Sequence, residues 1–181
     1  AISVITDILN KALEFRYFPD VWKVSVIKAI PKPGKDNTLA ASYRPISLLP
    51  ILGKMYEKTI KTRLMRYIAD KNIIPQHQFG FREKHSTIQQ VHRVTEKILR
   101  DMDNKMYCPA IFLDVSKAFD KVWHTGILHT IQTLLPNDYF IILRSYLTNR
   151  NFIVTVEEAS SKVKRIYAGV PQGSVLGPLL Y

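Results

Sequence analysis

Residues 111–123 read Ile-Phe-Leu-Asp-Val-Ser-Lys-Ala-Phe-Asp-Lys-Val-Trp. Residues 110–113 are a short apolar run typical of a buried strand, and helical spacing returns at Phe119 and Trp123. Asp114 therefore falls at the end of a predicted strand, where a carboxylate is costly to bury unless it is paired or bound to a metal. Asp114 could supply one ligand to Mg²⁺. The spacing alone favours a simpler role, capping of the helix that follows.

The rest of the chain mixes helices and short strands. Apolar residues at helical spacing predict helices over 2–15, 52–67, 88–102, 125–135 and 138–147. Alternating β-branched residues predict strands over 22–30 and 43–49, and a hairpin of 151–156 with 163–167. These elements follow no regular strand–helix–strand rhythm, so the predicted fold class is α+β.

Composition limits the possible classes of protein. The chain has 181 residues, of which 46% are hydrophobic and 23% charged, as expected for one globular domain or two small ones. No apolar run approaches the roughly 20 residues of a membrane span, so no membrane partner is expected. The single Cys108 excludes an internal disulfide and a zinc site built from thiolates. The five histidines lack the spacing of a metal site.

Charge gives the first indication of a partner. The formal net charge is +11, with 18 basic and 8 acidic side chains in residues 1–100 against 8 and 7 in residues 101–181. A basic first half favours a polyanion, with nucleic acid ahead of an acidic membrane surface. A basic surface that serves solubility alone is the simpler alternative.

Two further stretches could bind a ligand. The sequence Gly-Val-Pro-Gln-Gly-Ser-Val-Leu-Gly-Pro at 169–178 predicts a bent backbone that a flat ligand could approach closely, with Gln172 offering both a donor and an acceptor. Lys32 and Arg44 are expected on facing arms of a hairpin, where two cations could hold a triphosphate. An ordinary turn and two solvated charges explain the same patterns.

Five segments in order are more specific than any one of them. They are PKPGK (31–35), YRPISLLP (43–50), QFGFR (78–82), FLDVSKAFDKVWH (112–124) and GVPQGSVLGPLLY (169–181). In this order they resemble the reverse transcriptases of non-LTR (LINE-type) retrotransposons, most closely the insect jockey-like group. The resemblance runs from about residue 20 to the last residue. It implies an RNA-directed DNA polymerase with the fingers and part of the palm of a right-hand fold.

The resemblance also implies roles for single residues. Asp114 matches the aspartate that binds both catalytic Mg²⁺ ions, and the carbonyl of Val115 would touch one of them. Phe119 matches the aromatic gate that excludes a ribose 2′-OH and so selects dNTPs. Gln172 and Gly173 match residues that line the pocket for the dNTP and the template.

Further roles fall in the basic first half. Lys32 and Arg44 match residues of the fingers that hold the incoming triphosphate. The residues that match a template-supporting segment are Gln78, Gly80, Phe81 and Arg82. The implied division is a fingers-like region with an N-terminal helix at 1–105 and a partial palm at 106–181. The implied partners are an RNA template, a DNA primer and dNTPs.

One family motif is missing from the sequence. The aromatic-x-Asp-Asp turn, which supplies the other metal-binding aspartates, does not occur before Tyr181, and no thumb is expected. Since two-metal catalysis needs carboxylates for both ions, we expect the 181-residue chain to be inactive by itself. We also expect poor solubility or oligomerisation, because the 110–115 strand would have an unpaired edge.

Two other readings remain open at this point. One is a relic of such a polymerase that binds nucleic acid without catalysis. The other is a basic interaction module whose motif-like loops are ordinary turns. No basic cluster is a convincing nuclear signal, so the sequence leaves the location in the cell unassigned.

Overall fold

The computed structural model describes residues 2–181, which form two compact units. The first unit combines the segment up to Tyr67 with Lys117–Tyr181, and the second is Ile68–Ser116. The two units are defined by which residues contact one another, not by function. The functional division near residue 105, which follows from the family resemblance, stays a prediction.

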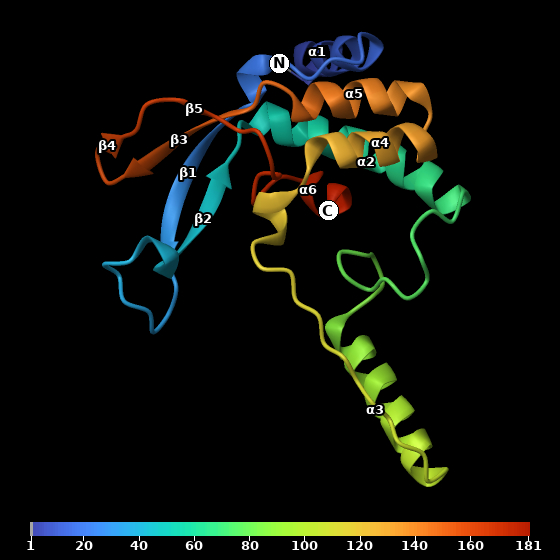
Figure 1. Ribbon diagram of the computed structural model, residues 1–181. Coiled ribbons are helices and arrows are strands. Elements are labelled where there is room, and N and C mark those ends of the chain that lie inside the picture. The colour runs from blue at the N-terminus through green and yellow to red at the C-terminus, as the bar shows by residue number, and fades with distance from the viewer. Residues whose placement is uncertain (1) are drawn as a thin grey trace. The chain divides into compact units, whose positions relative to one another are not determined.

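A mixed five-stranded sheet organises the first unit (Figure 1). The strands are β1 (Val24–Pro31), β2 (Tyr43–Leu48), β3 (Asn151–Val156), β4 (Ala159–Ser160) and β5 (Lys164–Arg165). The order is β2-β1-β3-β4, with β5 also paired to β3. β1 is antiparallel to β2 and parallel to β3, and β3 is antiparallel to β4 and β5. The predicted strands at 22–30 and 43–49 and the hairpin after residue 151 are confirmed.

Helices account for most of the remaining first unit. They are α1 (Ile2–Glu14), α2 (Ile51–Asp70), α4 (His124–Leu134), α5 (Asn137–Leu147) and the short α6 (Gly177–Leu180). The last turn of α2, from Ile68, falls in the second unit. Short 3₁₀ turns lie at Asp20–Trp22, Ala40–Ser42 and Ala118–Lys121. Pro50 and Pro136 directly precede α2 and α5, as expected where a proline ends the extended segment before a helix. The predicted α+β mixture of helices and strands is therefore present.

Aromatic rings fill the core of the first unit. Phe18 is fully buried, with its ring centroid 5.1 Å from that of Tyr146 and 5.4 Å from that of Tyr56. Trp22 closes the cluster, with its ring 5.6 Å from Tyr56. Such tilted and edge-to-face pairs stabilise a core beyond the apolar area they bury. As a large aromatic residue, Trp123 is predicted from the sequence to pack in the core. It is instead mostly exposed, so this prediction was wrong.

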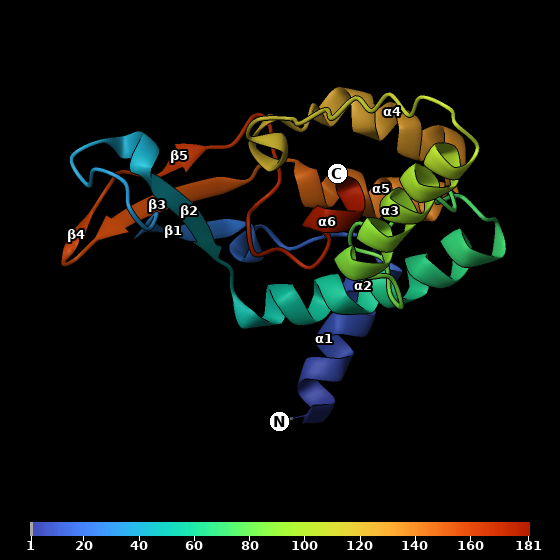
Figure 2. The ribbon, with the colours of Figure 1, turned by 90° about the horizontal axis from the view of Figure 1, so that it is seen from below.

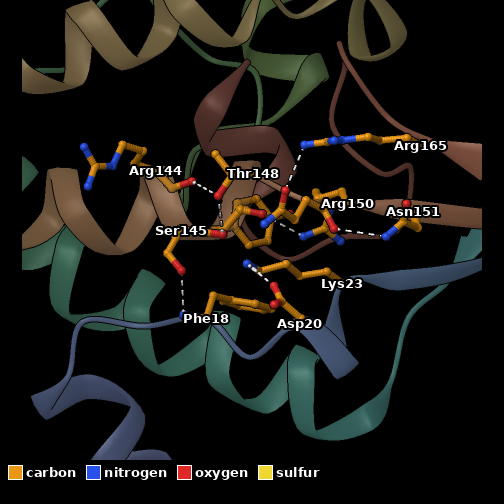
Figure 3. Close-up of polar contacts among 11 residues, drawn as sticks. Phe18, Asp20, Lys23, Arg144, Ser145, Thr148, Arg150, Asn151 and Arg165 are labelled. Carbon is orange, nitrogen blue, oxygen red and sulfur yellow. Dashed lines mark hydrogen bonds and ion pairs between the residues drawn. The ribbon is translucent and has the colours of Figure 1, made fainter.

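Two buried cations lie where α5 passes into β3 (Figure 3). Lys23 Nζ donates to Asp20 Oδ1 at 2.8 Å, and this bond lowers the pKa of Asp20. Arg150 Nη1 donates to the carbonyl of Tyr146 at 3.1 Å, and its guanidinium lies 4.5 Å from the Tyr146 ring centroid. Because a buried charge needs such partners, these contacts fix the junction between helix and strand.

The second unit is built around α3 (Thr87–Asp103). The sequence predicts either Ser86 or Thr87 as the cap of this helix. Ser86 forms a complete capping box: Gln89 N donates to Ser86 Oγ at 3.2 Å, and Ser86 N donates to Gln89 Oε1 at 2.9 Å. Near the other end, Lys97 Nζ lies 2.6 Å from Asp101 Oδ1. From the sequence, Asp101 and Asp103 could form a metal-binding pair or, more simply, part of a solvated turn. Asp101 is instead buried and paired with Lys97.

The predicted strand at 110–113 is absent. Residues 106–115 form neither helix nor strand, and Ile111, Phe112 and Leu113 are 87%, 86% and 90% exposed. A strand needs a neighbour for its backbone hydrogen bonds. Within residues 2–181 no strand pairs with this segment, so its apolar composition alone does not make it one. This prediction was wrong.

Candidate functional site

The β1–β2 hairpin carries the two cations expected to hold a triphosphate. Arg44 on β2 is opposite Ile30 on β1, and Lys32 follows Ile30 by two residues. Because side chains alternate along a strand, Arg44 and Lys32 are placed toward the same face of the hairpin. Lys32 N donates to the carbonyl of Ser42 at 2.8 Å, which continues the hairpin past the end of β1. The predicted placement on facing arms is confirmed.

Both cations retain donors for a ligand. Lys32 Nζ donates to the carbonyl of Ala41 at 2.8 Å, which uses one of the three donors of an ammonium group. Arg44 is exposed. Exposed Lys28 belongs to the same face, so the hairpin presents positive charge on the side that carries Arg44.

The loop of residues 169–177, called the GVPQGS loop below, docks on the free edge of this sheet. Ser47 on the edge strand β2 donates from its backbone N–H to the carbonyl of Gln172 at 2.8 Å. Gly173 follows with φ +117°, a backbone conformation that favours glycine. The loop therefore satisfies a backbone group that an edge strand would otherwise leave unpaired.

The turn that carries Phe119 contacts the same loop. Val170 N donates to the carbonyl of Phe119 at 2.8 Å. Gln172 Nε2 donates to Asp120 Oδ1 at 3.2 Å. The half-buried Phe119 ring lies 5.1 Å from the ring of Tyr181. Two residues predicted for nucleotide selection, Phe119 and Gln172, are thus brought together by backbone and side-chain bonds.

Sequence reasoning missed the groups that hold this loop in place. His124 is partly buried, as its sequence context predicts for a boundary residue, and its Nε2 lies 2.7 Å from the carbonyl oxygen of Gly169. Glu57 on α2 is buried, and its Oε2 accepts a bond from Ser174 Oγ at 2.6 Å. The sequence did contain an indication that Glu57 is buried. This carboxylate directly follows Tyr56 and precedes Ile60 by three residues, which places it on the apolar stripe of a helix.

The residues expected to support the template lie in the second unit. Gln78 N donates to the carbonyl of Pro75 at 3.1 Å, and Arg82 Nη1 donates to the same carbonyl at 3.3 Å. Phe81 is exposed and has a positive φ of 55°. Gly80 is also exposed. These four residues therefore share one turn of the chain.

Asp114 and Val115 also belong to the second unit, in the irregular segment before Ser116. Both residues are exposed. Phe119 and Gln172 belong to the first unit. No group of three His, Cys, Asp or Glu side chains within residues 2–181 could hold a metal ion together. The described residues therefore do not form a complete site for two Mg²⁺ ions.

Comparison with known proteins identifies the family to which the chain belongs. Residues 30–181 match the family described as reverse transcriptase (RNA-dependent DNA polymerase), which is a class of template-directed nucleic-acid polymerases. The chain belongs to the reverse transcriptase family. The family in general uses divalent metal ions.

The relatives are polymerases of mobile elements. Over 181 residues the chain is 49% identical to the "Probable RNA-directed DNA polymerase from transposon X-element", 48% identical to the corresponding protein from transposon BS, and 46% identical to the RNA-directed DNA polymerase from mobile element jockey, all from Drosophila melanogaster. All of this chain is covered in each comparison, but about a fifth of each relative. The predicted resemblance to the jockey-like group is confirmed.

Within residues 2–181, no helix is both long enough and apolar enough to cross a membrane. Cys108 is a free thiol.

Proposed function

We propose that the chain forms the nucleotide-selecting part of an RNA-directed DNA polymerase of a non-LTR retrotransposon. In this proposal the polymerase adds dNTPs to a DNA primer on an RNA template. Residues 1–105 correspond to the fingers with an N-terminal helix, and residues 106–181 to part of a palm, without a thumb. The observation that carries the proposal is the attachment of the Phe119 turn to the GVPQGS loop, which joins two nucleotide-selecting residues in one unit.

Each candidate site residue of the first unit has a chemical role in the proposed reaction. The aromatic ring of Phe119 excludes a ribose 2′-OH by its bulk. Gln172 and Gly173 line the pocket for the nucleotide and the template base. Lys32 and Arg44 bind the triphosphate, because a guanidinium and an ammonium both form charge-assisted hydrogen bonds with phosphate oxygens.

The second unit supplies the remaining groups of the proposal. The 78–82 turn supports the template strand. Asp114 and the carbonyl of Val115 contribute oxygen ligands for Mg²⁺, the hard cation that prefers carboxylates and phosphates. Further carboxylates are needed for a second ion, since the described residues hold no acidic cluster.

The test uses a chimaera, because the chain spans about a fifth of its relatives. Residues 1–181 replace the matching segment of the jockey polymerase, and primer extension is measured on a primed RNA template with dNTPs and Mg²⁺. We expect incorporation that depends on both the RNA template and the dNTPs. No incorporation by a folded chimaera, when the unaltered jockey polymerase is active in the same assay, would overturn the proposal.

A relic that binds nucleic acid without catalysis is the second candidate. The net charge of +11 favours it. The relic binds RNA with an affinity that falls as salt rises, because its cations replace counterions of the phosphates. RNA binding by the chimaera without any incorporation would favour this candidate.

A further inference from the structure

The GVPQGS loop is fastened to α2 through one buried carboxylate. Glu57 is 1% exposed, and its Oε2 accepts hydrogen bonds from Ser174 Oγ at 2.6 Å, Val175 N at 2.6 Å and Leu176 N at 3.0 Å. In Figures 1 and 2 the short α6, which follows these residues, lies close to α2. One side chain on a helix thus satisfies three donors on a loop more than a hundred residues away in sequence.

The proton positions in this network follow from the donors. Backbone N–H groups can only donate, so Oε2 accepts from Val175 and Leu176. Ser174 has one hydroxyl proton, which it donates to Glu57. Tyr146 Oη, 2.6 Å from Ser174 Oγ, must then donate to that oxygen. Burial raises the pKa of Tyr146, with the charge of Glu57 adding to the effect, so the phenol keeps the proton that it donates.

Two attachments flank Gly173. On its C-terminal side, Glu57 accepts hydrogen bonds from residues 174–176. On its N-terminal side, the carbonyl of Gln172 accepts a hydrogen bond from Ser47 N on β2. Gln172 and Gly173 therefore lie between an attachment to the sheet and an attachment to α2. Loss of the second attachment leaves the backbone directly after Gly173 held by fewer bonds, chiefly those of Ser174 with Tyr146 Oη and with the amides of Leu176 and Gly177.

We infer that Glu57 is a positioning residue for nucleotide binding, which acts through Ser174 and the amides of Val175 and Leu176. It does not contact the nucleotide. It fixes the backbone that presents Gln172 and Gly173. This inference rests on the proposed function, because the pocket that it positions is the proposed nucleotide pocket.

The main experiment measures the KM for dNTP and the kcat of the chimaera with Glu57→Ala, Glu57→Gln and Leu64→Ala. Leu64 is a buried residue of the same helix with no side-chain polar group to bind the loop, so Leu64→Ala is the matched control. A variant that merely unfolds a fraction of the protein lowers kcat and leaves KM unchanged, since the remaining folded molecules bind normally.

For Glu57→Ala we expect the KM for dNTP to rise about 10- to 100-fold, as for a misplaced binding group. Glu57→Gln keeps an acceptor oxygen, so its KM is expected between those of the wild type and Glu57→Ala. Leu64→Ala is expected to keep KM within about twofold of the wild type. An unchanged KM in Glu57→Ala, or an equal rise in Leu64→Ala, would overturn the inference.

Hydrogen exchange on the same proteins separates this inference from the proposed function. The amide of Val175, which donates to Glu57, is expected to exchange at least about tenfold faster in Glu57→Ala than in the wild type or in Leu64→Ala. The amide of Leu176 also donates to Ser174 Oγ, so it is expected to change less. Faster exchange with no polymerase activity in the wild-type chimaera would support the attachment and overturn the proposed function. Unchanged exchange would overturn the inference even if the chimaera is active.

Discussion

Gly173 lies so close to Ser47 that a Cβ added to the glycine would be 2.8 Å from the Ser47 carbonyl oxygen. The glycine also has φ +117°, where side chains are strained. The GVPQGS loop therefore reaches the edge of the sheet only because residue 173 has no side chain.

Gly173→Ala is expected to destabilise the first unit by about 1–3 kcal/mol, through backbone strain and the clash with β2. Thermal unfolding of the 181-residue chain measures the change. Gly80→Ala is the control, because nothing lies within 4 Å of its added Cβ and its φ is not in the positive range. Equal melting temperatures for the two variants would contradict the close approach.

Phe119→Ala is expected to weaken discrimination against rNTPs in the chimaera. The smaller side chain leaves room for a 2′-OH, while the backbone bond from Val170 N to the Phe119 carbonyl can remain. The measurement is the ratio of kcat/KM for dNTP to that for rNTP, which we expect to fall at least about tenfold. Phe119→Tyr keeps the bulk and should keep the ratio. Unaltered selectivity in Phe119→Ala would remove the gate role.

The reactivity of Cys108 is expected to depend on Asp101. A hydrogen bond to the Asp101 carboxylate is the main reason that the pKa of this thiol lies above its ordinary value of 9.0. A raised pKa means less thiolate at any pH below it, and the thiolate is the form that is alkylated. Asp101→Asn removes the negative charge and should lower the pKa.

Iodoacetamide labelling followed by mass spectrometry between pH 7 and pH 9 tests this dependence. Labelling of Cys108 should be faster in Asp101→Asn than in the wild type at each pH in this range. Asp103→Asn, at the exposed end of α3, should label at the wild-type rate. Equal or slower labelling in Asp101→Asn would contradict the assigned contact.

The exposed segment at 111–113 is expected to promote self-association of the 181-residue chain. Three neighbouring apolar side chains in water form a patch that other copies can cover. The double change Phe112→Ser with Leu113→Lys should reduce oligomers in size-exclusion chromatography with light scattering, whereas Lys162→Ser in an exposed loop should not. A sharp monomer peak for the wild type would count against this expectation.

Local sequence patterns predicted most of the helices and strands. Helical spacing located α2 and α3, and the Ser86 cap was foreseen because capping is a property of a few neighbouring residues. The 110–113 run failed as a strand because strand formation depends on a partner that a local pattern does not contain. Trp123 failed as a core residue for a similar reason, since its burial depends on what packs against it.

The candidate site was predicted in part. Motif order identified Lys32, Arg44, Phe119 and Gln172, and the hairpin register brings the first two together. Glu57 and Tyr146 escaped because their role is a contact with Ser174, across 117 and 28 residues of sequence. Contacts between residues so far apart in sequence cannot be predicted from a local pattern. A carboxylate on the apolar stripe of a helix nevertheless indicates that a buried hydrogen-bond partner exists.

The most direct measurement of the central claim is primer extension by the chimaera with Asp114→Asn. If this carboxylate serves the reacting centre of an RNA-directed DNA polymerase, its loss removes several kcal/mol of transition-state stabilisation, and incorporation should fall at least about 10²- to 10³-fold. Asp103→Asn should retain wild-type activity. Incorporation by Asp114→Asn within about threefold of the wild type would contradict the account.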